Sequence, residues 1–180
     1  MCRFVPPKAT QAAQRRSVMR ELLPVAEKVA LRLIAQKQTI AVAESSAGGL
    51  IASALLAVPG ASAYFVGSAV VYTREARRVL MDIPDPDMKG LRSSSEPYAE
   101  LLAKQIRSRL GADWALSETG AAGPSGNRYG DAAGHTCIAV AGPRQAVMTL
   151  ETESADRVEN MHVFAATALT FLLRMMTPIG

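Results

Sequence analysis

Two adjacent hydroxyl groups precede a glycine pair where one apolar run of the sequence ends and another begins. Ser45 and Ser46 follow the apolar run 39–43, and the glycine pair at 48–49 leads into the apolar run 50–58. A buried strand and a core-facing helix account for the two runs, so we expect Ser45 or Ser46 at the helix N-cap. The unpaired N–H groups of a first helical turn stabilise an anion by roughly 0.3–2 kcal/mol. The turn therefore predicts either an anion site beside a nucleophilic serine, or a serine cap whose glycines serve only the backbone.

A second glycine-rich segment, 117–127, leaves the end of an expected short strand over 114–117. In open α/β sheets, ligands bind beyond the carboxyl ends of the strands, where both segments could lie. The second segment is not a P-loop, because it lacks the Lys-Ser/Thr ending. It is not a dinucleotide fingerprint either, because a strand is expected to follow it. It therefore indicates a ligand loop or an ordinary turn.

An alternation of helices and strands must position these two segments. We expect helices over 15–36, 50–58, 74–81, 95–110 and 155–176, strands over 39–43, 65–73 and 114–117, a hairpin over 136–141 and 146–150, and no regular structure over the proline-rich 83–87. This pattern predicts a three-layer α/β/α sandwich, and the hairpin makes its central sheet mixed. The absence of a repeat or linker predicts one domain over 16–180 after a mobile tail, 1–15.

Composition narrows the function classes. The chain has 180 residues, of which 49% are hydrophobic and 20% charged, which suits one well-buried core. The formal charge is +4, but the basic residues are scattered and aromatic residues make up 5%, so we expect a small anionic ligand and no nucleic acid. No cluster of His, Cys and carboxylates has ligand spacing, so we expect neither a metal nor a cofactor.

Cysteine usage and the N-terminal sequence bear on where the protein resides. The two cysteines, Cys2 and Cys137, do not make a disulfide framework, which predicts a reducing compartment. The chain has no secretory start and no apolar run of roughly 18 residues, so we expect a cytoplasmic protein without membrane contact. An organelle presequence is the alternative interpretation of the basic, acid-poor start.

The sequence carries five motifs in a fixed order, which are Glu44–Leu50, Val58–Ser62, Val71–Arg77, Thr119–Pro124, and Gly134 leading into Ile138–Val140. Together they resemble the ordered motifs of the CinA C-terminal domain. The resemblance covers the chain from about residue 16 and implies a stand-alone α/β/α domain that forms homo-oligomers. It also implies nicotinamide-nucleotide amidohydrolase activity of the PncC type, which converts nicotinamide mononucleotide to nicotinate mononucleotide and ammonia.

The same resemblance assigns roles to individual residues through a serine–lysine dyad. Ser45 takes the place of the nucleophile that attacks the carboxamide carbon, while Tyr72 and Arg77 belong to the motif that carries the second dyad member. Helix amides at 47–49 are the expected oxyanion donors, worth roughly 3 kcal/mol each. The substrate-binding positions are Ser46, Gly48, Gly49, Thr119, Gly120, Gly123 and Arg157. Arg157 either holds the ligand phosphate bidentately or is a solvated residue at a helix start.

The chain departs from the family pattern at Arg77, where the family has the dyad lysine. Arginine stays charged above pH 12, so its neutral fraction at pH 7 is on the order of one in a million. It can bind phosphate or an oxyanion but cannot accept a proton. His135 is the alternative base if it lies within about 3 Å of Ser45. His162 is a weaker candidate, and we expect Glu44 to brace the turn.

Two functions remain open at the level of the sequence. The first, which we favour here, is an active amidohydrolase with a rearranged base. The second is a catalytically silent nucleotide-binding or assembly protein that kept the pocket of the family.

Overall fold

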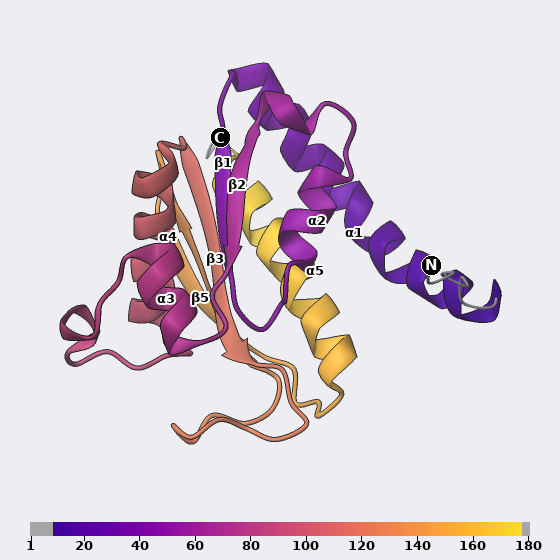
Figure 1. The fold of residues 1–180 in the computed structure, drawn as a ribbon. Helices are drawn as coiled ribbons and strands as arrows, with labels where there is room; N and C mark the ends of the chain where they lie inside the picture. The colour runs from indigo at the N-terminus through magenta and orange to yellow at the C-terminus, as the bar shows by residue number, and fades with distance from the viewer. Residues whose placement is uncertain (1–8, 178–180) are drawn as a thin grey trace, which may run out of the picture.

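A computed structural model describes residues 9–177 and shows a five-stranded sheet at the centre of the molecule (Figure 1). The strands are β1 (Ile40–Glu44), β2 (Phe65–Val70), β3 (Trp114–Ala121), β4 (His135–Ala141) and β5 (Ala146–Glu151). Their order is β2-β1-β3-β4-β5. Strand β1 pairs in parallel with β2 and β3, whereas β4 is antiparallel to β3 and β5. The mixed sheet with its C-terminal hairpin confirms the prediction.

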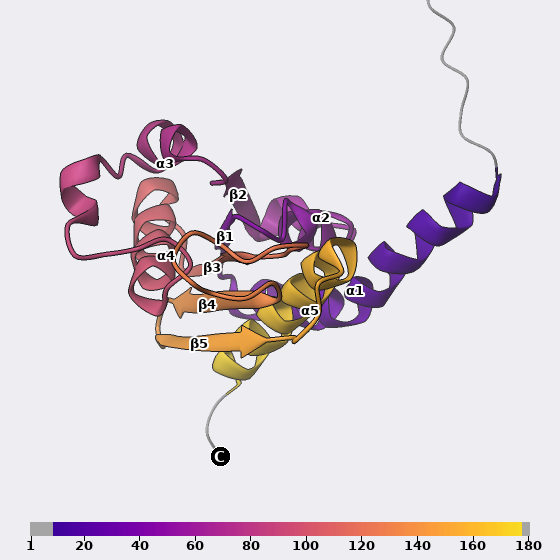
Figure 2. The ribbon, with the colours of Figure 1, turned by 90° about the horizontal axis from the view of Figure 1, so that it is seen from below.

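Helices cover both faces of this sheet, as Figures 1 and 2 show. Helices α1 (Ala9–Gln36), α2 (Leu50–Leu56) and α5 (Arg157–Met175) pack on one face, and α3 (Arg74–Met81) and α4 (Glu96–Leu110) lie on the other. Two short 3-10 helices, Ala61–Ala63 and Asp85–Met88, complete the set. The expected three-layer α/β/α sandwich is confirmed. The first turns of α1 project away from the other helices and the sheet (Figure 1).

Strand β1 is buried on both faces because alternate side chains of a strand point to opposite sides of the sheet. Ile40 and Val42 join the core beneath α1, α2 and α5, while Ala41 and Ala43 join the core beneath α4. An apolar strand between two helical layers is typical of parallel pairing. The first apolar run of the sequence therefore lies at the centre of the molecule.

Several element boundaries differ from those expected. Residues 1–8 of the expected tail lie outside the described part of the chain, and residues 9–15 are turns of α1. Strand β2 ends at Val70. Helix α5 begins at Arg157, because the Asp156 carboxylate accepts hydrogen bonds from the N–H groups of residues 158 and 159 and caps the helix.

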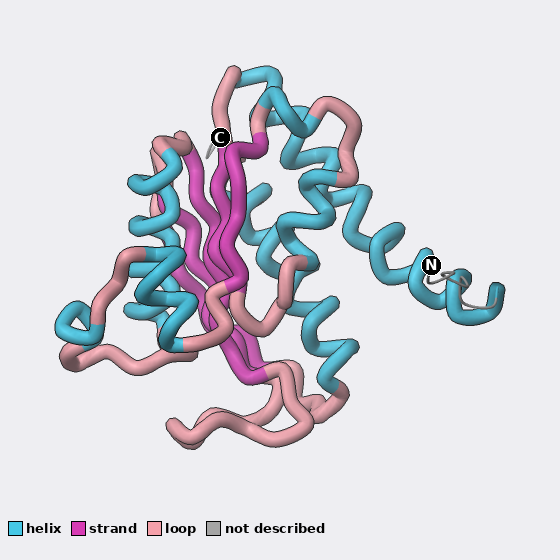
Figure 3. Tube along the Cα trace, viewed as in Figure 1, coloured by secondary structure: helices cyan, strands magenta, loops and turns pink. Residues whose placement is uncertain are grey.

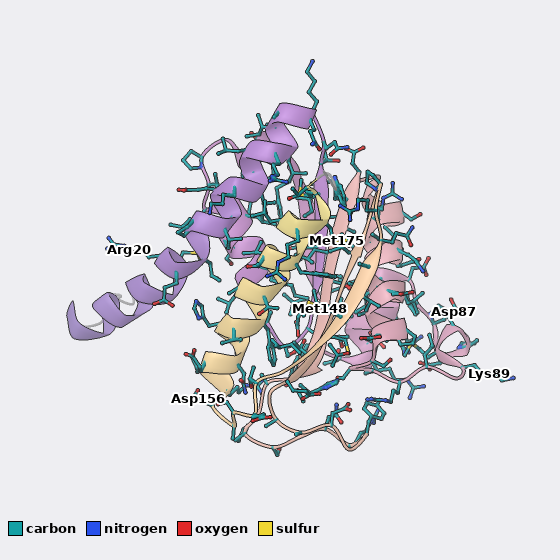
Figure 4. The ribbon with its side chains drawn as sticks, turned by 180° about the vertical axis from the view of Figure 1, so that it is seen from behind. Arg20, Asp87, Lys89, Met148, Asp156 and Met175 are labelled. Carbon is teal, nitrogen blue, oxygen red and sulfur yellow. The ribbon has the colours of Figure 1, made fainter. Side chains whose placement is uncertain are left out.

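The connections that follow the parallel strands meet at one end of the sheet (Figure 3). Asp156 lies at this end and Met175 at the opposite one, while Met148 lies on β5 between them (Figure 4). Asp87 and Lys89 mark the outer tip of the connection between α3 and α4 (Figure 4). No helix in the described chain is long and apolar enough to cross a membrane.

Candidate functional site

A cavity of about 530 Å³ lies where the carboxyl ends of β1, β2 and β3 meet α3 and α4. Its size is typical of small-molecule sites. Its walls come from the segments after β1 and β2, the end of β3, α3, the α3–α4 connection, the start of α4 and the β3–β4 connection. The lining residues that matter below are Ser45, Tyr72, Arg74, Arg77, Asp85, Tyr98, Thr119, Gly120, Arg128 and Tyr129. Five predicted site residues from three distant motifs thus share one cavity.

Ser45 is the part of the serine turn that faces this cavity. Its side chain is half-buried, and its Oγ makes no hydrogen bond to any residue within 9–177. Ser46, Gly48 and Gly49 are not among the described lining residues. The turn therefore contributes one hydroxyl to the cavity, not a cradle of backbone amides.

The expected N-cap at Ser45 or Ser46 is wrong. Helix α2 begins at Leu50, and its N-cap is Gly49 at a φ of 96°. Gly48 also has a positive φ, 67°, and a left-handed residue cannot belong to a right-handed helix. The two glycines therefore hold the serines outside the helix.

Glu44 occupies the amides that open α2. Its carboxylate accepts hydrogen bonds from the N–H groups of Gly49, Ile51 and Ala52 at 2.9, 3.0 and 2.9 Å. Burial raises the pKa of Glu44 to about 7, assisted by the nearby charge of Glu118 and opposed by these three amides. Glu44 thus braces the turn as expected, and the Gly49 amide is not available to a ligand oxyanion.

Glu118 holds the same turn from β3. Its carboxylate accepts the N–H groups of Ser45 and Ala47 at 3.0 and 2.8 Å, and it also accepts the hydroxyls of Ser46 and Thr136. The Gly48 N–H bonds to the carbonyl of Ser45 at 3.2 Å. The expected oxyanion donors at 47–49 are therefore occupied by the protein itself.

Arg77 reaches the cavity from α3 with a side chain only 8% exposed. One guanidinium nitrogen, Nη2, pairs with Asp85, which also pairs with Arg74. The hydrogen bonds and charges of Arg74 and Arg77 hold the pKa of Asp85 at about 2. The Nε of Arg77 is buried and finds no partner within the described residues. Asp85 is thus a permanently charged anion between two cations.

The other predicted binding residues are divided between the cavity and its surroundings. The hydroxyl of Thr119 lines the cavity and accepts the N–H of Ser94 at 3.3 Å. Arg157 lies outside the described lining and donates to the Gly123 carbonyl at 2.7 Å and the Tyr72 hydroxyl at 3.2 Å. Arg157 therefore links α5 to two segments of the site.

Gly120 serves strand packing as well as the cavity wall. It lies within β3, where a Cβ atom would collide with the carbonyl oxygen of His135 and lie 2.7 Å from the Cβ of Thr136. The expected glycine loop therefore begins later than predicted, because residues 117–121 continue the strand.

The two histidines are placed away from Ser45. His135 bonds through Nδ1 to Glu151 and through Nε2 to the Ser94 carbonyl at 2.9 Å, and neither histidine is among the described lining residues. Burial alone would lower the pKa of His135, but its bonds to Glu151 and Ser94 raise the pKa overall. His162 lies on α5, 3.3 Å from Glu21. The structure therefore does not bring His135 to the serine as a base.

The β3–β4 connection adds two residues that the sequence reasoning did not select. Arg128 donates to the Tyr129 hydroxyl at 2.8 Å, and its guanidinium lies 5.0 Å from the ring centre. Hydrogen bonds from Arg128 and Ser93 lower the pKa of Tyr129. An Arg-Tyr pair in a loop is common, so only its position at the cavity identifies it as part of the site.

The sequence analysis also missed Asp85, because the prolines on either side of it indicated only an interruption of regular structure.

A model of the CinA C-terminal domain matches residues 22–176. The chain belongs to this family. A CinA-like protein from Desulforapulum autotrophicum is 36% identical over 164 residues, which are 91% of this chain and 39% of the relative. A CinA-like protein from Chlorobium limicola is 37% identical over 82% of this chain and 37% of its own. The chain thus spans about two fifths of the length of these curated relatives.

Solved structures of the CinA superfamily have the same fold. The competence damage-inducible protein A of Klebsiella pneumoniae gives a TM-score of 0.80 at 25% identity, over 85% of this chain and 95% of its own. A competence or damage-inducible protein of Enterobacter asburiae gives 0.81 at 25% identity, over 87% and 98%. The CinA-type α/β architecture is therefore established for this chain.

Proposed function

We propose that the cavity of this CinA domain binds a pyridine mononucleotide, with nicotinamide mononucleotide as the reference ligand. The observation that carries the proposal is that Ser45, Tyr72, Arg77, Thr119 and Gly120, which the family resemblance singles out, line one cavity. The described lining holds three guanidinium groups, those of Arg74, Arg77 and Arg128, and one carboxylate, that of Asp85. An excess of cations in a concave site favours an anionic ligand.

The exposed cations suit a phosphate, and the aromatic residues suit a planar ring. Arg74 and Arg128 are exposed and can turn toward a phosphate, which guanidinium groups bind bidentately. Tyr72 also lines the cavity, and an aromatic ring there can stack on a pyridinium. In this proposal Arg157 acts through its hydrogen bond to the Tyr72 hydroxyl.

Hydrolysis of the carboxamide by Ser45 is the second candidate function, favoured by its free hydroxyl in the cavity. In that reaction Oγ attacks the carboxamide carbon, ammonia leaves with a proton, and water releases the acid from the acyl-enzyme. A base must first accept the serine proton. The described lining includes an Asp85 carboxyl whose pKa is about 2, and it includes neither a lysine nor a histidine. Binding without efficient turnover is therefore the better-supported function.

Calorimetric titration with nicotinamide mononucleotide, together with an assay for released ammonia, tests both candidates. We expect saturable binding, no ammonia above the blank, and an affinity in Ser45→Ala within about three-fold of the parent, since a lost neutral contact is worth little. Ammonia release that disappears in Ser45→Ala would establish the amidohydrolase instead. Absence of binding would contradict the proposal as a whole.

The Arg77→Lys variant separates a missing base from other causes of inactivity. A lysine buried at this position can lose roughly 3–5 pKa units and become a base. If Arg77 is the only reason that the site does not hydrolyse the amide, this variant should release ammonia from nicotinamide mononucleotide. A variant as inactive as its parent would remove that explanation.

We also infer from the family that the protein acts as a homo-oligomer, and from its cysteine usage that it resides in the cytoplasm. Light scattering on the purified full chain tests the first inference, and a monomer at micromolar concentration would contradict it.

A further inference from the structure

We propose that Arg77 makes the cavity selective for a ligand carboxylate, so that it binds nicotinate mononucleotide in preference to nicotinamide mononucleotide. The inference rests on the proposed function, because it assumes that a pyridine mononucleotide enters the cavity. It concerns a different question, namely whether the acid or the amide is the preferred ligand.

The donors of Arg77 are the first ground for this inference. A guanidinium group carries five N–H donors and no acceptor. Within the described chain only Nη2 of Arg77 makes a hydrogen bond, to Asp85, and Nε is buried without any partner. Buried donors without acceptors are rare and costly in native proteins. A ligand that brings acceptor oxygens to Arg77 therefore supplies what the protein leaves out.

The chemistry of the two ligands is the second ground. A carboxylate presents two charged acceptor oxygens that match the planar fork of a guanidinium group. A carboxamide presents one neutral acceptor, and its NH₂ group would face the N–H donors of Arg77. The contact of Arg77 with Asp85 shows that a carboxylate fits beside this guanidinium group.

The placement of Arg77 is the third ground. It faces the same cavity as Ser45, and its side chain is 8% exposed, whereas that of Arg74 is 73% exposed. A charge-assisted hydrogen bond is stronger where water is excluded. Arg128 and Arg74, which also pairs with Asp85, are exposed and are the candidates for the phosphate. A ligand with both a phosphate and a carboxylate therefore balances the cations of the cavity more fully than the amide does.

Calorimetric titrations of the full chain with the two mononucleotides at one fixed salt concentration test the preference. We expect nicotinate mononucleotide to bind about ten-fold more tightly, which is the size of one additional charge-assisted contact. In Arg77→Gln the ratio of the two affinities should fall to about one. The matched control is Arg78→Gln, since Arg78 lies next in α3, pairs with Glu75 and is not among the described lining residues. This control should keep the full preference.

Two further variants guard against a folding defect. Arg77→Lys replaces the planar fork by a single amino group, so it should retain only part of the preference. Asp85→Asn removes the internal carboxylate that competes for Arg77 and should strengthen binding of the acid more than that of the amide. Thermal unfolding of each variant checks that the chain is folded.

The outcomes distinguish the two proposals. Equal binding of both ligands to the parent, or tighter binding of the amide, overturns the inference and leaves the proposed function standing. A preference that survives in Arg77→Gln overturns the assignment to Arg77. Failure of both ligands to bind the parent overturns both proposals.

Discussion

Two buried carboxylates hold the serine turn without a cationic side chain among the described residues that contact them. Glu44 and Glu118 are fully buried, and together they accept five backbone N–H groups and two hydroxyls. Hydrogen bonds to an ionised group are about twice as strong as neutral ones, which offsets part of the cost of burying the charge. The carboxylates of Glu44 and Glu118 thus bind the amide N–H groups that the sequence analysis assigned to a ligand anion.

Replacing Glu118 with glutamine should destabilise the protein strongly. Its partners are the two backbone N–H groups of Ser45 and Ala47 and the hydroxyls of Ser46 and Thr136. A glutamine can keep its oxygen toward the N–H groups only by turning its NH₂ group to the hydroxyls, which must then accept instead of donate, and every contact loses the help of the negative charge. We expect Glu118→Gln to lower the free energy of unfolding by about 2–4 kcal/mol in urea titrations. The exposed Glu75→Gln should change it by less than about 0.5 kcal/mol. Similar values for the two variants would contradict this role of Glu118.

The raised pKa of Glu44 predicts a loss of stability as the pH rises. Burial moves this pKa from its ordinary 4.5 to about 7, so between these values the folded chain binds more protons than the unfolded one. Stability therefore falls from about pH 4.5 to pH 7, by at most about 3 kcal/mol from this group. Urea unfolding at several pH values should show a smaller fall in Glu44→Gln, and equal slopes in the two proteins would refute the assignment.

At the scale of elements, the sequence predicted nearly every helix and strand, but it misplaced the N-cap of α2 and the end of β3. Both errors arose from glycines. The pair at 48–49 delays α2 because of its left-handed backbone, whereas Gly120 lies inside β3 because β4 passes too close for a side chain. A single sequence does not distinguish a glycine that turns the chain from one that permits close packing.

Gly120→Ala should therefore open the β3–β4 pairing. Its methyl group would collide with the backbone of His135 and lie 2.7 Å from the Cβ of Thr136, neither of which can yield without shifting β4. We expect a loss of about 2–4 kcal/mol in the free energy of unfolding. Gly67→Ala in β2 is the matched control, because its methyl group would meet only the end of the Leu110 side chain at 3.3 Å. That variant should lose less than about 1 kcal/mol, and calorimetric unfolding of both tests the difference.

At the scale of the whole molecule, two long connections that lie far apart in the sequence, α3–α4 and β3–β4, form part of the cavity wall. Ser45, Tyr72 and Arg77 were predicted as site residues because they belong to motifs that resemble those of the CinA C-terminal domain, and all three line the cavity. Asp85 and Arg128 were not, because the conformation of a connection depends on contacts between distant segments. Here a bidentate pair between Arg92 and Asp131 joins the α3–α4 and β3–β4 connections.

Asp131→Asn should loosen both connections at once. Asp131 also accepts a hydrogen bond from the Asn127 side chain at 2.8 Å, so the variant loses the charge that orders this wall. We expect faster amide hydrogen exchange over 122–134 and an affinity for nicotinamide mononucleotide lowered by about three- to ten-fold. Asp87→Asn, on an exposed tip of the α3–α4 connection, is the control. Unchanged exchange over 122–134 in Asp131→Asn would count against this bridging role.

The hydrogen bonds from the serine turn to Glu44 and Glu118 also bear on how fast a ligand binds. Because this turn is fixed before any ligand arrives, encounter with the cavity requires no slow rearrangement there. Ligands of similar charge should then associate at similar rates, and differences in their affinity should appear in how long each complex survives. Substitutions at the cavity arginines should therefore change the dissociation rate of the complex more than its association rate.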